Sequence, residues 1–191
     1  MNKLTRADIV DNETYLKERE ERRKNVIALK QRRRVEVGKN LSFTFENQET
    51  VKYQIQEMMR VEQITDEEKI EQEVRVYNEL IPENNSLSAT MFIEIPETEQ
   101  IKKILDTFQG LDHPGAVYMT VNDDRIPANF EEGHSREDRI SAVHYVKFAL
   151  NDQQAQSFAN AQVEIVVDHQ RYQAKTALTR EQKQELASDL R

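Results

Sequence analysis

Apolar side chains alternate with polar ones in several short segments, and this alternation limits the fold more than any other feature of the chain. It runs through residues 41–45, 87–95 and 140–150. A period of two predicts β strands that bury one face, and such strands favour an antiparallel or mixed sheet over a buried parallel one. Shorter segments of the same kind predict strands at 116–121, 163–167 and 172–178.

Apolar residues at helical spacing separate these strands. Helices predicted at 49–63 and 66–81 are joined by a tight turn, so we expect an antiparallel helical hairpin. Asn47 can cap the first helix, and Thr65 with Glu68 three residues later forms a capping box for the second. Shorter helices are expected at 101–108, after Asn151 and after Thr179. The predicted class is α+β, with helices on one face of the sheet.

The composition of the chain excludes several classes of protein. Its 191 residues are 37% apolar, which is enough for a single domain over residues 1–191 with a real core. It contains no cysteine, which excludes disulfide frameworks, thiolate zinc sites and cysteine-ligated iron–sulfur clusters, so any redox cluster would belong to a partner. Because the first residues are charged and no run approaches the roughly 20 apolar residues of a membrane span, we expect a cytoplasmic protein without membrane contact.

The positive charge of the chain is concentrated near its beginning. Residues 14–34 hold nine Lys or Arg and three Glu, whereas the whole chain has a net charge of -8. The segment has no Gly or Pro and spaces Glu and Arg three and four residues apart, which predicts a long, solvated N-terminal basic helix. Only the second half of the helix has a core face: Val26, Ile27 and Leu29 could pack, as could the more distant Tyr15 and Leu16. We therefore expect residues 1–34 to project partly from the domain.

The arginines of this helix are candidates for binding a partner. They are Arg22, Arg23, Arg32, Arg33 and Arg34. They could meet an acidic protein surface, including the chain's own acidic hairpin, or the phosphates of RNA. The alternative is a face whose charges are solvated or paired within the chain. No aromatic residues are interleaved to stack on bases, so a protein partner or self-association is favoured over nucleic acid.

A second group of candidates lies on the predicted hairpin. Glu57, Arg60, Glu62 and Asn78 are candidates for binding a small ligand in a cleft between the hairpin and the sheet. Glu could act as a base or metal ligand and Arg as an anion clamp, while Glu57 and Arg60 could hold each other in place. Helical bundles that bind two metal ions also use Glu-x-x-His, and no histidine is near, so we expect no metal and no cofactor. The plainer alternative is a solvated acidic face.

No catalytic motif stands out in the rest of the chain. Gly-x-Ser-x-Gly, a glycine-rich phosphate loop, a dinucleotide fingerprint and HExxH are all missing from the sequence. His144 lies on the apolar face of a predicted strand and is expected to be a hydrogen-bonded core residue, whereas His134 lies in a predicted loop over 122–139. Asp168 and His169 could form an acid–base pair, but adjacent strand residues point to opposite faces.

Several stretches of the chain are similar to those of a known family. They are KLTRADIVDNETYLKEREERR, ALKQRRRVEVG, FENQETVKYQIQEMMRVEQI, YNELIP, LSATMFIEIP and SAVHYVKF. With these stretches the chain resembles the bacterial domain-of-unknown-function family 3501 over nearly its whole length, most specifically from Phe45 to Pro96. The resemblance carries over no catalytic or binding residue. It implies a context, because genes for similar proteins often lie beside those for rubrerythrin and an iron–sulfur oxidoreductase.

Three hypotheses for function follow. The leading one is an intracellular accessory or interaction protein that supports a redox partner system of the iron–sulfur or rubrerythrin type. The alternative is a small-ligand-binding protein or enzyme with the Glu/Arg site on the helical hairpin. The third is RNA binding through the basic helix. The residues leave open whether the chain is an enzyme.

Overall fold

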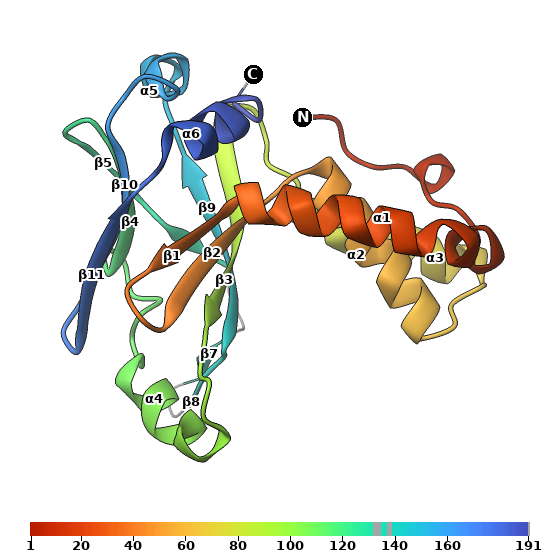
Figure 1. Cartoon of the computed structure of the whole chain (residues 1–191), viewed down its shortest axis with the longest axis horizontal. Helices are drawn as coiled ribbons and strands as arrows, with labels where there is room; N and C mark the ends of the chain where they lie inside the picture. The colour runs from red at the N-terminus through yellow and green to blue at the C-terminus, as the bar shows by residue number, and fades with distance from the viewer. Residues whose placement is uncertain (132–134, 137–138, 191) are drawn as a thin grey trace.

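The structure is a computed structural model that describes residues 1–131, 135–136 and 139–190. It confirms the predicted α+β class, with helices and antiparallel sheets. Figure 1 shows the β sheets with short helices near their ends, and the longer helices to one side. We call residues 1–32 and 47–81 the helical lobe, and the other described residues the sheet lobe.

Five strands form the larger sheet in the order β1-β2-β3-β9-β6, and each neighbouring pair is antiparallel. Their bounds are β1 Arg34–Val37, β2 Leu41–Glu46, β3 Ser86–Ile93, β6 Asn129–Phe130 and β9 Val143–Ala149. The turn between β1 and β2 contains Gly38 at φ +68. A Cβ atom at Gly38 would lie 2.2 Å from the hydroxyl oxygen of Tyr172, so this turn has no room for a side chain.

Four strands form the second sheet in the order β11-β10-β4-β5, again with antiparallel neighbours. Their bounds are β4 Val117–Val121, β5 Asp124–Pro127, β10 Val163–His169 and β11 Tyr172–Ala177. A two-stranded pair consists of β7 Ser135–Arg136 and β8 Arg139–Ile140. The sequence predicted one sheet, because alternation shows that a strand has a buried face but not which strands it pairs with.

The two larger sheets share one apolar core. Phe43, Phe45 and Phe148 of the first sheet and Met119 and Ile165 of the second are completely buried in the same cluster. The rings of Phe45 and Phe148 lie 6.2 Å apart between centroids. The prediction that helices cover one face of the sheet was therefore wrong here, because the apolar faces of the two sheets cover each other.

Short helices lie at the ends of the sheet lobe (Figure 1). They are η3 Thr98–Gln100, α4 Ile101–Thr107, α5 Asp152–Ser157 and α6 Arg180–Ala187. The helices expected after Asn151 and Thr179 are both present, and each begins with a capping box. No helix in the described part of the chain has both the length and the apolar character that crossing a membrane requires.

Segment 122–139, predicted as a loop, contains the short strands β5, β6 and β7. In β5 only Ile126 is buried, and its neighbours are exposed. The segment was predicted as a loop because it contains few apolar residues. An edge strand, however, needs no more than one buried side chain to pair with its neighbour. His134, which we placed in this segment, lies outside the described residues.

The helical lobe consists of short and long helices from the first half of the chain. They are η1 Arg6–Asp8, α1 Asn12–Arg32, α2 Gln48–Val61, α3 Glu67–Tyr77 and η2 Asn78–Leu80. Asn47 caps α2 as predicted. Asp66 rather than Thr65 caps α3, because its carboxylate accepts a hydrogen bond from the N–H of Lys69. Both residue types are good caps, so the local sequence could not decide between them.

The helical lobe has its own apolar core, separate from that of the sheets. The buried residues are Leu4, Ile9, Val51, Ile55, Met59, Ile64, Ile70, Val74, Leu80 and Ile81. Tyr145 on β9 packs against this cluster and connects it to the larger sheet. The hairpin of α2 and α3 therefore packs mainly on itself and on the N-terminal residues instead of lying flat on the sheet.

One side of α1 packs on α2, and the rest of α1 faces solvent. Tyr15 and Val26 are buried, whereas Leu16 and Ile27 are 58% and 43% exposed. The prediction that Leu16 and Ile27 could pack in a core was wrong. Each follows a buried residue of α1 directly, and one residue turns a helix by about 100°, away from α2.

Candidate functional site on the helical lobe

Glu57 on α2 is the centre of a hydrogen-bonded network that joins α1 to α2. The Tyr15 hydroxyl donates to Glu57 Oε1 at 2.6 Å, and Arg19 Nε donates to the same oxygen at 2.7 Å. Arg60 Nη2 donates to Glu57 Oε2 at 2.9 Å. The Glu57–Arg60 contact that the spacing predicted is therefore present, and two residues of α1 complete the network.

This network keeps Glu57 ionised. The hydrogen bonds from Arg19 lower the pKa of Glu57 from its usual 4.5 to about 2, and Arg60 and Tyr15 act in the same direction. Burial and the Glu57 carboxylate raise the pKa of Tyr15. A carboxylate whose oxygens already accept several hydrogen bonds, and whose pKa is so low, suits a structural ion pair rather than a general base.

The other two hairpin candidates lie away from Glu57 and Arg60. Glu62 follows the last residue of α2 and is exposed. Asn78 binds the N-terminal segment: the Leu4 N–H donates to Asn78 Oδ1 at 2.8 Å, and Asn78 Nδ2 donates to the Leu4 carbonyl oxygen at 2.9 Å. The structure thus brings two of the four candidates together and leaves the other two apart.

A pocket does lie between the hairpin and the larger sheet, but other residues line it. Its volume is about 260 Å³, and its lining comes from η2, β6 and β9 with the residue that follows β6. The lining residues are Glu79, Leu80, Asn129, Phe130, Glu131, Tyr145 and Lys147. Burial raises the pKa of Tyr145, with Glu46 adding to the effect. None of the four hairpin candidates lines this pocket.

The arginines after residue 31 form ion pairs within the chain. Arg33 is completely buried, and its guanidinium contacts Asp189 and Glu185, the latter at 3.1 Å. Arg32 contacts Glu185 at 3.2 Å, and Arg34 pairs with a glutamate that follows β3. The contacts of Arg32 and Arg33 connect the end of α1 to α6 and the residues after it, and none of these ion pairs reaches the acidic hairpin that we considered as their internal partner.

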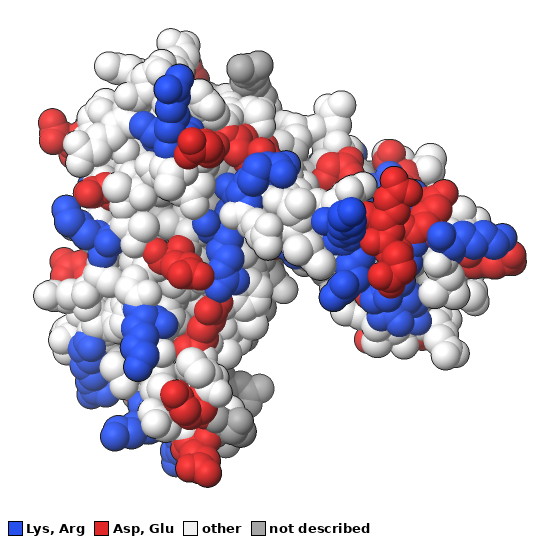
Figure 2. Space-filling model, viewed as in Figure 1, with Lys and Arg blue, Asp and Glu red and all other residues white. Residues whose placement is uncertain are grey.

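Arg22 and Arg23 differ from the later arginines because neither makes an ion pair with another helix or strand among the residues that the structure describes. Arg22 pairs with Glu18 one turn earlier at 2.6 Å. Arg23 is exposed and makes no ion pair with any residue in the described part of the chain. Acidic and basic side chains are mixed over the helical lobe in Figure 2, so its surface is not uniformly basic.

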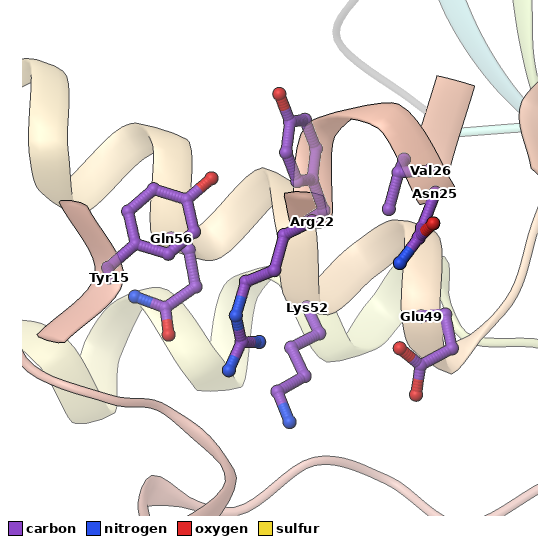
Figure 3. Close-up of a pocket in the computed structure, with 8 residues that line it drawn as sticks. Tyr15, Arg22, Asn25, Val26, Glu49, Lys52 and Gln56 are labelled. Carbon is purple, nitrogen blue, oxygen red and sulfur yellow. The ribbon is translucent and has the colours of Figure 1, made fainter. Parts of the chain in front are cut away.

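A groove of about 100 Å³ lies between α1 and α2. It is lined by Tyr15, Arg22, Asn25, Val26, Glu49, Lys52, Tyr53 and Gln56. Figure 3 shows Arg22 from α1 and Lys52 from α2 extending in the same direction, with Glu49 about one turn earlier on α2. The buried Gln56 is fixed, because its side-chain amide forms hydrogen bonds of 2.9 and 3.1 Å with the backbone of Val10.

Lys52 and Asn25 were not predicted from the sequence, although the spacing of residues on α1 indicated a contact on this side of the helix. Tyr15, Arg22 and Val26, with Arg19 between the first two, are spaced four, three and four residues apart and so share one side of the helix. This spacing indicates a contact with another helix. It does not say which helix, so it could not identify Lys52.

Among the described residues, His113 and His169 line one pocket of about 450 Å³ together with Asp168. In the part of the chain that the structure describes, no three His, Cys, Asp or Glu side chains are grouped so as to hold a metal ion. His144 is buried with its Nε2 2.8 Å from a backbone carbonyl oxygen, which confirms the predicted core position. His169 Nε2 lies 2.9 Å from the carbonyl oxygen of Gln109, while Asp168 accepts from a side chain on β11, so each of these neighbours has a different partner.

Comparisons with known proteins give a family and a structural relative. No curated protein matches the chain. A crystal structure of a novel protein of unknown function from Burkholderia pseudomallei K96243 is 33% identical, with 100% of each chain covered and a TM-score of 0.92. The family model described as "Protein of unknown function (DUF3501)" matches residues 3–190. This confirms the resemblance drawn from the sequence, and the chain belongs to the DUF3501 family.

Proposed function

We propose that this protein is an interaction protein that binds an acidic surface of a redox partner, of the iron–sulfur or rubrerythrin type, through the groove between α1 and α2. The observation that carries the proposal is that Arg22 and Lys52, from two different helices, extend in the same direction at one groove. The class of partner comes from the gene context that the family resemblance implies. A carboxylate of the partner would bind between the two cations.

The size of the groove supports a protein side chain as its occupant. Its volume of about 100 Å³ is below the range of about 300–1,000 Å³ that is usual for small-molecule sites. Asn25 at the rim adds an amide that can donate a hydrogen bond to a carboxylate.

The charge of the groove is also available to a partner. Lys52 makes no ion pair with any of the residues that the structure describes. Arg22 pairs with Glu18, but both side chains are partly exposed, and such surface pairs are weak. Arg33 is completely buried in internal ion pairs, which leaves one cation fewer for the phosphates of RNA and favours a protein partner.

The proposal is tested by titrating the purified protein with a purified rubrerythrin-type protein and a purified iron–sulfur oxidoreductase from the same source. We expect one of them to bind, with an affinity that falls as the salt concentration rises. Replacing Arg22→Glu and Lys52→Glu together should weaken binding by at least about tenfold, because like charges would then face each other.

The matched control is Lys102→Glu with Lys103→Glu, which makes the same change of charge on the exposed face of α4. Binding should be nearly unchanged in this control. The proposal is wrong if neither partner binds, or if the control weakens binding as much as the groove variant does. The second result would mean that net charge, and not the groove, controls association.

A further inference from the structure

A stripe of four exposed residues runs along the side of α1 that faces solvent. Leu16, Glu20, Arg23 and Ile27 are spaced four, three and four residues apart, so they share one side of the helix. Leu16 and Ile27 are 58% and 43% exposed, and the Glu20 side chain is 83% exposed. Arg23 is exposed and has no ion-pair partner among the described residues. We call these four residues the outer stripe.

From either end, the outer stripe begins with an apolar residue, continues with two residues of opposite charge and ends with a second apolar residue. If two copies of α1 run antiparallel about a twofold axis, Leu16 of one copy meets Ile27 of the other. Glu20 then meets Arg23 of the other copy, and both contacts occur twice. A twofold interface requires this self-complementarity, because each contact between two positions is repeated with the copies exchanged.

We infer that the outer stripe binds a second copy of this chain, with the two α1 helices antiparallel. The stripe spans eleven steps of about 1.5 Å, or about 16 Å, which is enough for three turns of helix contact. Complementarity continues beyond it, because Glu13 in one copy would lie opposite Lys30 in the other. A parallel pair is disfavoured because Glu20 would face Glu20 and Arg23 would face Arg23.

This dimer goes beyond the proposed function and leaves the groove open. Tyr15, Arg19, Arg22 and Val26 lie on the side of α1 that contacts α2. Each outer-stripe residue directly follows one of these four residues in the sequence. One position is a rotation of about 100° around the helix. Asn25 in the groove lies one position earlier than Val26, so the groove and the outer stripe are on opposite sides of the α1–α2 contact.

The first test is the oligomeric state, measured by sedimentation equilibrium over a wide range of protein concentration. We expect a concentration-dependent dimer, since a contact of one helix is at the small end of interface sizes. Replacing Leu16→Asp and Ile27→Asp together should weaken dimerisation by at least about tenfold. The matched control, Val76→Asp with Ile101→Asp, removes two apolar residues that are 59% and 41% exposed elsewhere, and should leave the dimer intact.

The second test exchanges the charges of the stripe. Glu20→Arg or Arg23→Glu alone should each weaken the dimer by about tenfold, because each places like charges opposite each other. An equal mixture of the two single variants should associate again, since Glu20→Arg in one chain then faces Arg23→Glu in the other. The double exchange within one chain should also restore the dimer.

The inference is overturned if the wild-type chain stays monomeric at every concentration, if the Val76/Ile101 control breaks the dimer as much as the stripe variant, or if mixing the single charge variants restores nothing. Circular dichroism of each variant confirms that it is folded. The Arg22→Glu/Lys52→Glu variant should still dimerise. Loss of partner binding with an intact dimer, or the reverse, therefore tells the two proposals apart.

Discussion

Two networks of arginine and carboxylate hold the two ends of α1, and they differ in burial. Near the start of α1, Arg19 binds Glu57, and the two side chains are 26% and 21% exposed. After the end of α1, Arg33 binds Asp189, and these side chains are 0% and 2% exposed. The pKa values move in opposite directions: Arg19 lowers the pKa of Glu57 to about 2, whereas burial raises the pKa of Asp189 although Arg33 opposes it.

The difference shows that an arginine partner does not by itself decide whether the pKa of a carboxylate is lowered or raised. Glu57 keeps contact with water and gains hydrogen bonds from Tyr15, Arg19 and Arg60, so its ionised form is stabilised. Asp189 loses nearly all of its water, and the loss outweighs the attraction of Arg33. The first network stabilises the α1–α2 contact, while the second fixes how α1 joins the sheet lobe.

The largest effect is expected from Arg33→Met. It leaves Asp189 buried without its cation and removes the guanidinium hydrogen bond of 2.8 Å to the Phe45 carbonyl oxygen. Breaking a buried pair in this way costs about 3–5 kcal/mol of the free energy of unfolding, measured by urea denaturation. Arg32→Met, at a side chain that is 55% exposed, should cost less than about 1 kcal/mol. Equal losses from the two variants would contradict the distinction by burial.

Glu57→Gln should have a smaller effect. The shape of the side chain is kept, but the charge-assisted hydrogen bonds from Tyr15, Arg19 and Arg60 are weakened, so we expect a loss of about 2 kcal/mol in the free energy of unfolding. Glu62→Gln, at the exposed end of α2, serves as the control and should stay within about 0.5 kcal/mol of wild type. A control as costly as Glu57→Gln would mean that the network adds no stability.

The two networks should respond to acid with opposite signs. The pKa of Glu57 is lower in the folded state than its usual 4.5, so its stabilising contribution is present above pH 4.5 and is lost as the pH falls toward 2. The pKa of Asp189 is raised above its usual 3.8, so its contribution is present below pH 3.8 and is lost as the pH rises through the folded pKa.

Unfolding free energies of wild type, Glu57→Gln and Asp189→Asn, measured across this acid range, check these signs. Glu57→Gln should flatten the rise of stability with pH, and Asp189→Asn should steepen it. A shift of both variants in the same direction would show that the two carboxylates do not differ as described.

The smallest effect is expected from Tyr15→Phe. The variant keeps the buried ring and removes the hydroxyl that donates to Glu57 at 2.6 Å, which should cost about 1 kcal/mol in the free energy of unfolding. It should also raise the pKa of Glu57, because the hydroxyl helps to lower it. The pKa can be followed by NMR titration of the Glu57 carboxylate. An unchanged pKa would show that the two arginines alone hold this network.

Much of the local structure could be predicted from the sequence. Asn47, Asn151 and Thr179 were recognised as helix starts from one side chain and its spacing to the next residues, and all three accept the expected capping hydrogen bond. The α+β class followed from alternation in segments such as 41–45, which forms most of β2. The Glu57–Arg60 contact followed from a spacing of three on one helix.

The candidate site was less predictable. Arg19 and Tyr15 were not connected with Glu57, and Lys52 was not connected with Arg22, because each contact joins two helices whose orientation no local pattern specifies. The grouping of the strands into two sheets depended in the same way on pairings between distant segments, as between β3 and β9.

By itself, the sequence determined where most of the helices and strands form, which face of most of them is apolar, and that α1 carries the positive charge. These features depend on residues within a few positions of one another, where spacing alone fixes the geometry. Only the tertiary structure decided which carboxylates Arg19 and Arg33 meet. Arg33 and Asp189, for example, are 156 positions apart, and their contact exists because packing of the sheet lobe brings α6 and the residues after it to the end of α1.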